Sequence, residues 1–263
     1  MRTIFLKEMK LNLKNLLIWS ISVGGLGLVC ILLYQSMQGD MKQMADAFSN
    51  MGAFSDAFGM STLSIATLNG YFATEVGTVH GLGGGMFAAI LAIGILSKEE
   101  ERHSGEFLLS LPVTRNKVVA AKGLCTAVML AAFTIICAVF YALGYVILDE
   151  ALPGSAFLTF MGRQLLMNLE IAGMCFCLSA VSGKNRMGSG IGLAMLFYAY
   201  DLIGRVVPDL KEYLFWGPYS YANASEIFSG AKTPVSGLFV AAGVTVLCIF
   251  SAFILYNRRD LAA

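Results

Sequence analysis

Five polar or ionisable residues fall within otherwise apolar stretches of the chain: His80, Asn168, Glu170, Asp201 and Arg205. An ionisable side chain in the hydrocarbon region of a membrane is costly, so it indicates a function such as proton transfer or a polar path for a substrate. Glu170, with Asn168 two residues before it, could line such a path or bond to a partner subunit. Equally, Glu170 could be a protonated acid whose hydrogen bond to a neighbouring helix only fixes the register of that helix.

The spacing of Asp201 and Arg205 indicates an ion pair. The two residues are four apart, so a helix places them on one face, and we favour a structural pair near the end of that helix. A proton relay through His80, Glu170 and Asp201 can also be drawn, although nothing in their spacing requires it.

A charged segment followed by an apolar turn is the second candidate site. Nine of the chain's charged residues fall between Lys98 and Lys122, and a leucine-rich turn and a proline follow the acidic run. This pattern predicts a surface that docks onto a partner outside the membrane, where charges set the orientation and apolar residues form a buried anchor. The alternative is a loop whose charge only sets the topology. The residues assigned to docking are Glu99, Glu100, Glu101, Arg102, Gly105, Phe107, Leu108, Leu109, Pro112 and Arg115.

The elements that must position these residues are membrane spans. Of the 263 residues, 57% are hydrophobic and 13% are charged, whereas soluble domains carry about 25% charged residues. Since about 20 apolar residues cross the hydrocarbon core as a helix, we predict an all-α polytopic membrane protein with six transmembrane helices. The predicted spans are Leu16–Tyr34, Tyr71–Leu96, Leu124–Leu148, Arg163–Val181, Gly188–Ile203 and Val235–Tyr256.

Lysine and arginine set the predicted orientation. Thirteen of them lie in the N-terminal segment, the loops after spans two and four, and the tail, against five in the remaining segments. Because cytoplasmic loops carry the excess of these residues, both termini and the 97–123 loop are expected to be cytoplasmic. The chain is thus predicted to form one domain, residues 1–263.

Two further segments are predicted to lie at the membrane surfaces. Residues 1–15 place Phe5, Met9, Leu13 and Leu16 on one helical face, which predicts an amphipathic interfacial helix whose lysines face lipid phosphates. Residues 204–233 are rich in aromatic side chains around Gly217-Pro218 and are expected to form short helices that re-enter the outer interface. A lid over an exit pathway is the functional alternative for this segment.

Common enzyme motifs are missing from the sequence. It contains no GxxxxGK[ST], HExxH or GxSxG, and its six cysteines all fall in apolar runs without CxxC spacing. The run Gly81–Gly85 lacks the lysine and hydroxyl of a phosphate loop and is better explained by close helix packing. We therefore expect neither catalysis nor a bound metal or cofactor, and no nucleic-acid partner.

The segment from Glu99 to Arg115, together with the six spans, resembles the permease subunits of ABC-2-type transporters. Members have a charged run, Gly-Thr, a leucine-rich turn, Leu-Pro and a basic residue; here Glu106 replaces the usual threonine, which puts the detail of docking in doubt. Pro218-Tyr219 is similar, more weakly, to the outer Pro-aromatic segment of the family.

The resemblance implies that the 97–123 segment is a coupling helix seated in a separate ATP-binding subunit, which carries the ATP and Mg. It also implies two ATPase subunits, two permease copies (identical or homologous), the bacterial cytoplasmic membrane, and export of a substrate such as a drug, an antimicrobial peptide or a lipid-like molecule. Two rivals are a proton-coupled secondary carrier using Glu170 and His80, and a membrane anchor or assembly protein that does not transport.

Overall fold

The computed structural model describes residues 1–49, 51–101, 113–184, 186–231 and 235–259. Within these residues, six helices are long and apolar enough to cross a membrane, and no strand is present. The prediction of an all-α protein with six spans is thus confirmed. The spans are α1 (Arg2–Ser49), α4 (Gly77–Ile93) with the turns that precede it, α7 (Arg115–Ile147), α8 (Gly154–Val181), α9 (Met187–Val206) and α12 (Val235–Arg258).

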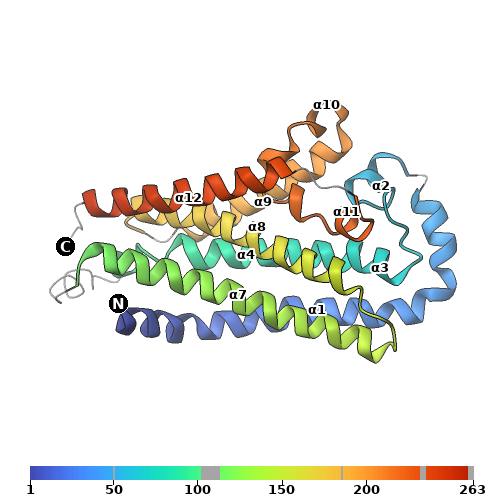
Figure 1. Ribbon diagram of the computed structural model, residues 1–263, viewed down its shortest axis with the longest axis horizontal. Helices are drawn as coiled ribbons and strands as arrows, with labels where there is room; N and C mark the ends of the chain where they lie inside the picture. Colours follow the sequence, from blue (N-terminus) through green and yellow to red (C-terminus); the bar gives the residue numbers. More distant parts are fainter. Residues whose placement is uncertain (50, 102–112, 185, 232–234, 260–263) are drawn as a thin grey trace.

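The six long helices form one bundle in which both chain termini lie at the same end (Figure 1). This end is called the inner end below, in keeping with the expected orientation, and the opposite end is called the outer end. Helix α4 is central: it packs on α1, α8 and α9, while α7 packs on α1 and α12 packs on α8. Small residues such as Ala88, Ala89 and Ala92 on α4 are fully buried, so neighbouring helices can approach it closely.

The N-terminal segment differs from the prediction. Residues 1–15 do not form a separate interfacial helix, because α1 continues without a break from Arg2 through the first span. No proline or glycine occurs before Gly24 to interrupt its hydrogen-bond ladder. Phe5 and Met9 pack against the core, whereas Leu13 is 48% exposed, so the predicted apolar face is only partly buried.

The second span is flanked by short elements. The four-residue helix α3 (Leu68–Tyr71) and the π-helix η1 (Phe72–Val76) lead into α4, and the four-residue helix α5 (Lys98–Glu101) follows it. Helix α7 begins at Arg115, so residues 115–123 of the predicted cytoplasmic segment form the start of the same helix as the third span. The predicted docking residues Arg102, Gly105, Phe107, Leu108, Leu109 and Pro112 lie outside the described residues.

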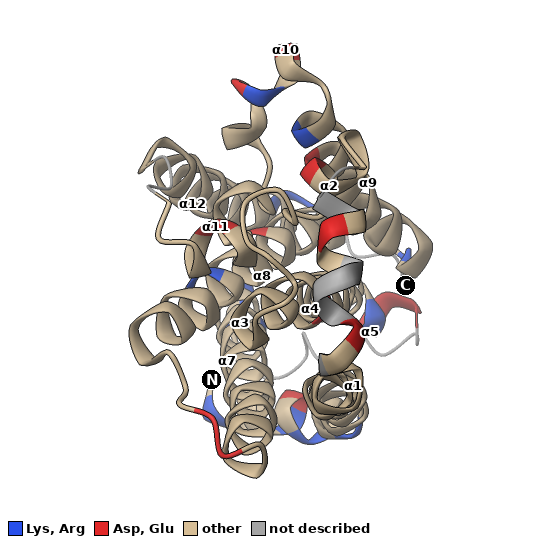
Figure 2. Cartoon of the chain, turned by 90° about the vertical axis from the view of Figure 1, so that its right-hand side faces the viewer, with Lys and Arg blue, Asp and Glu red and all other residues tan. Residues whose placement is uncertain are grey.

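The outer end is covered by short elements. These are α2 (Ala53–Ala57), α10 (Pro208–Lys211), η2 (Leu214–Trp216), η3 (Ser220–Ala222) and α11 (Ala224–Phe228). Seen from this end, α10 carries both signs of charge at the periphery of a bundle that is mostly uncharged (Figure 2). Residues 214–228 are called the outer segment below. This segment turns back onto the bundle, as the burial of Tyr221, Ala222 and Ile227 shows, whereas Trp216 is 59% exposed.

Candidate functional site

A cluster of buried charges joins three helices at the inner end. Glu8 of α1 is 1% exposed and pairs with Lys98 of α5. Lys122 of α7 is fully buried, pairs with Glu99 of α5, and places its Nζ 3.7 Å from Glu8 Oε1. Two cations and two carboxylates therefore balance one another. The Lys122 ammonium also donates to the carbonyl of Ile95, which helps to compensate for its lost hydration. We call Glu8, Lys98, Glu99 and Lys122 the inner charge cluster.

A second set of polar contacts joins α5 to two other helices. Glu100 pairs with Arg259, whose guanidinium also donates to the carbonyls of Ala180 (3.2 Å) and Ser182 (2.6 Å) at the end of α8. Arg115 donates to the carbonyls of Asn257 (3.1 Å) and Arg259 (2.6 Å) at the end of α12. Partial burial raises the pKa of Glu100 above its ordinary value, and the nearby positive charges of Arg259 and Arg115 oppose that rise.

These contacts change the interpretation of the acidic run. Glu99 and Glu100, predicted to orient a partner, instead bind helices of the same chain, whereas Glu101 is exposed. Their use in docking stays a prediction. The sequence did contain a signal for the cluster, because Glu8 is the only acidic residue before Asp40 and Lys122 lies within an apolar run. That signal was missed, since the two residues are far apart in the chain.

Glu170 is held by the outer segment. It is 2% exposed, and the Tyr221 hydroxyl donates to its Oε2 at 2.7 Å. The neighbouring Asn168 is fully buried, and neither atom of its side-chain amide has a hydrogen-bond partner within the described residues. The structure thus places Glu170 against a short element of the same chain, which the sequence did not indicate.

The predicted ion pair of Asp201 and Arg205 is present and has a third member. Arg205 donates from Nε and Nη2 to the two carboxylate oxygens of Asp201 at 2.8 and 3.1 Å. Its Nη1 donates to Glu226 Oε1 at 2.8 Å. Because Glu226 lies in α11, this bidentate arginine attaches the outer segment to the end of α9.

His80 lies in a separate environment. It is fully buried, its Nδ1 is 2.9 Å from the Tyr141 hydroxyl, and its ring stacks on Phe133 with centroids 5.5 Å apart. His80, Glu170 and Asp201 therefore have three different partners, and no hydrogen bond within the described residues links one to another. The conceivable proton relay has no support in this arrangement.

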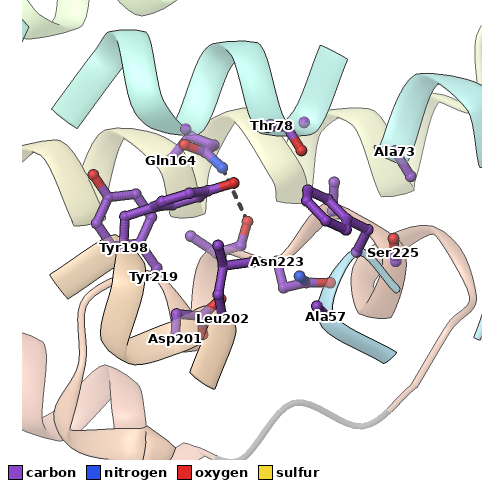
Figure 3. Close-up of a pocket in the computed structure, with 15 residues that line it drawn as sticks. Ala57, Ala73, Thr78, Gln164, Tyr198, Asp201, Leu202, Tyr219, Asn223 and Ser225 are labelled. Carbon is purple, nitrogen blue, oxygen red and sulfur yellow. Dashed lines mark hydrogen bonds between the residues drawn. The ribbon is translucent and has the colours of Figure 1, made fainter. Parts of the chain in front are cut away.

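A small polar pocket opens between α4, α8, α9 and the outer segment. Figure 3 shows Thr78 and Gln164 above this pocket and Asp201 and Leu202 below it. Its cavity of about 50 Å³ is far smaller than the pockets of roughly 300–1,000 Å³ that hold drug-sized ligands. Within the described part of the chain, no group of three His, Cys, Asp or Glu residues could hold a metal ion.

Comparison with known proteins supplies the remaining finding. The sequence model of a family described as ABC-2 family transporter protein matches residues 2–261. Among the curated proteins, none matches the chain.

Proposed function

From the premise that this chain belongs to the ABC-2 transporter family and is a multi-pass permease component of an ABC transporter, we propose how it works. It couples ATP hydrolysis by a separate ATP-binding subunit to export across the bacterial cytoplasmic membrane. Two copies of the permease, identical or homologous, assemble with two ATPase subunits, which carry the ATP and Mg. The exported substrate is a drug, an antimicrobial peptide or a lipid-like molecule.

The inner charge cluster is the observation that carries this proposal. Helix α5 begins the segment that the resemblance assigns to ATPase docking. Its consecutive acids Glu99 and Glu100 form ion pairs with different parts of the bundle. Glu99 connects α5 to Lys122 of α7, and the neighbouring Lys98 connects it to Glu8 of α1, while Glu100 connects it to Arg259 beyond α12. Separating a buried ion pair is strongly unfavourable, so a displacement of α5 by an ATPase draws several spans with it.

The outer segment supplies the other end of the mechanism. Its contacts with Glu170 and Arg205 fix it to α8 and α9, and those helices also pack on the central α4. We assign to this segment the role of a lid: a rearrangement of the spans that begins at α5 separates it from the bundle and opens the exit toward the outside.

Copurification tests the partner first. A tagged chain is extracted gently from its host, and a stoichiometric P-loop ATPase in the complex supports the transporter role. A chain recovered alone, from a preparation that preserves other complexes, contradicts it and favours a carrier. If the ATPase activity of the complex is not stimulated by any substrate, the chain is better explained as a membrane anchor or assembly protein that does not transport.

Coupling is then tested with Glu99→Gln against the matched control Lys117→Gln. Glu99 is buried and paired with Lys122, whereas Lys117 is exposed on the same helix as Lys122 and is not among the residues assigned to docking. In the purified complex, Glu99→Gln is expected to keep the ATPase bound but to reduce the stimulation of its activity by substrate. An equal response of the two variants contradicts transmission through the inner charge cluster.

A further inference from the structure

Three polar side chains converge on the glycine-rich face of α4. Gln164 and Asn168 lie one turn apart on α8, and Tyr219 comes from the outer segment. A methyl group at Gly84 would lie 2.8 Å from Asn168 Nδ2, and one at Gly85 would lie 2.2 Å from the Tyr219 hydroxyl. The missing side chains of these glycines therefore make the room that the polar groups occupy. We call Gln164, Asn168 and Tyr219 the polar cradle.

The polar cradle holds several buried groups that have no hydrogen-bond partner among the described residues. Asn168 Nδ2 and Oδ1, Gln164 Oε1 and the Tyr219 hydroxyl are all buried and lack a hydrogen-bond partner in the described part of the chain. Their residues are at most 6% exposed. Gln164 Nε2 does have a partner within the described ranges, the carbonyl of Ala222 at 3.0 Å. Since buried polar groups in native proteins are nearly always satisfied by protein or by ordered water, these atoms indicate a ligand.

Two of the three residues of the polar cradle line the pocket at the outer end. Gln164, Tyr219 and Gly81 line that pocket, and Asn168 and Gly84 lie about one helical turn further along α8 and α4 toward the inner end. Figure 3 shows Gln164 and Tyr219 side by side at the pocket wall. A cavity of about 50 Å³ has room for a few water molecules, because one water needs only about 10–15 Å³ of such space.

We propose that the polar cradle binds ordered water, which bridges α4 and α8 to the outer segment and extends the outer pocket into the bundle. The unsatisfied groups include a donor, Asn168 Nδ2, and an acceptor, Gln164 Oε1. A bare cation would leave the donor unsatisfied, and an anion would leave the acceptor unsatisfied, whereas water both donates and accepts. The outer pocket that Gln164 and Tyr219 line, with a cavity of about 50 Å³, is too small for a drug-sized compound.

This hydration affects how the outer segment is held. Where Tyr219 faces α4 and α8, its hydroxyl bonds to water that can stay behind when the segment moves. Moving the outer segment therefore leaves no buried polar group without a hydrogen-bond partner at this contact. The inference itself does not depend on transport, because it concerns only the occupant of the polar cradle, and its test uses no substrate or ATPase.

The test measures whether a small aqueous probe reaches the polar cradle in the folded protein. In a full-length background whose six native cysteines are replaced by alanine or serine, single variants Gln164→Cys, Asn168→Cys and Met167→Cys are prepared in detergent. Ag⁺ is the probe, because it travels through water and binds thiolates. After timed exposure, the protein is denatured and the thiols that remain free are labelled with a maleimide. Met167 is the matched control, because it is adjacent to Asn168, equally buried, and part of the apolar core.

We expect both cradle cysteines to be blocked at least about tenfold faster than Met167→Cys, which Ag⁺ reaches only when the bundle opens locally. Equal rates at the three positions overturn the proposal. Blocking at position 164 alone also overturns it, because water would then end at the pocket.

A second measurement keeps the proposal testable if the cysteine-free background does not fold. In the otherwise native chain, Asn168→Leu is expected to lower the thermal unfolding midpoint, because leucine displaces water that bonds to Gln164 and Tyr219. If the polar cradle held no water, the same change would remove a buried amide that lacks hydrogen bonds, and the unfolding midpoint would stay the same or rise. An unchanged or raised midpoint therefore overturns the proposal.

Discussion

The hydroxyl of Tyr221, in the outer segment, donates a 2.7 Å hydrogen bond to Glu170, a buried acid of the fourth span. This relationship narrows the alternatives for Glu170. Among the described residues, Glu170 has no hydrogen bond to a neighbouring long helix, to His80 or to Asp201; its partner Tyr221 belongs to a short element at the outer end. Glu170 is thus a fixing point for the lid in the proposed mechanism.

Tyr221→Phe is expected to lower the free energy of unfolding by about 0.6 kcal/mol, the average measured for hydrogen bonds in a membrane protein, and by no more than about 1.7 kcal/mol, the largest value measured there. Glu170→Gln should cost less, because its amide oxygen can still accept the bond from Tyr221. Chemical denaturation in detergent measures both variants. The coupling energy comes from a cycle of Tyr221→Phe with Glu170→Leu, because leucine cannot accept the bond. Additive effects of Tyr221→Phe and Glu170→Leu would contradict a direct bond.

Glu170→Gln also separates the exporter from a proton-coupled carrier. A carrier that moves protons through Glu170 should lose transport in this variant, whereas the exporter should retain most of its ATP-dependent activity. Transport into inverted vesicles makes the comparison, measured once with ATP supplied and the proton gradient collapsed by an ionophore, and once with an imposed proton gradient and no ATP. Complete loss of ATP-driven transport in a stable variant would contradict the role assigned here.

Lys122→Met is expected to destabilise the protein strongly, by about 3–5 kcal/mol, because it leaves the buried acids Glu8 and Glu99 without their shared cation. Lys117→Met is the control: Lys117 lies on the same helix but is exposed, so its replacement should change the stability by no more than about 0.5 kcal/mol. Unfolding in denaturant compares the two. A Lys122 variant as stable as the control would show that the inner charge cluster is not a structural unit.

Arg205→Lys tests how the outer segment is attached. Lysine keeps the charge but cannot bind Asp201 with two parallel bonds while also reaching Glu226. Residues 214–228 should therefore exchange amide hydrogen faster in this variant, while the exchange of α4 stays unchanged. If exchange in the outer segment is also unchanged, Arg205 does not hold it.

The spans could be predicted from the sequence because hydropathy and length are local properties. The pair of Asp201 and Arg205 could be predicted for the same reason, since both residues lie on one helix. Glu8 and Lys122 could not be paired in advance, because their meeting depends on how α1 and α7 pack. The inward direction of Glu99 likewise depends on tertiary contacts, because a four-residue helix has no face of its own to indicate burial.

The inward direction of Glu99 decides how ATPase docking must be tested. Reversing the charge of all three acids from Glu99 to Glu101 would mix two effects, since a lysine at position 99 would face Lys122 in a buried site and damage the permease itself. Glu101→Lys alone addresses docking, because Glu101 is exposed and its reversal should alter stability by no more than about 0.5 kcal/mol. We expect this variant to fold normally but to retain less ATPase on copurification, and more so at low salt, where repulsion between exposed charges is least screened. Unchanged recovery of the ATPase at every salt concentration would show that the charge of Glu101 has no part in docking.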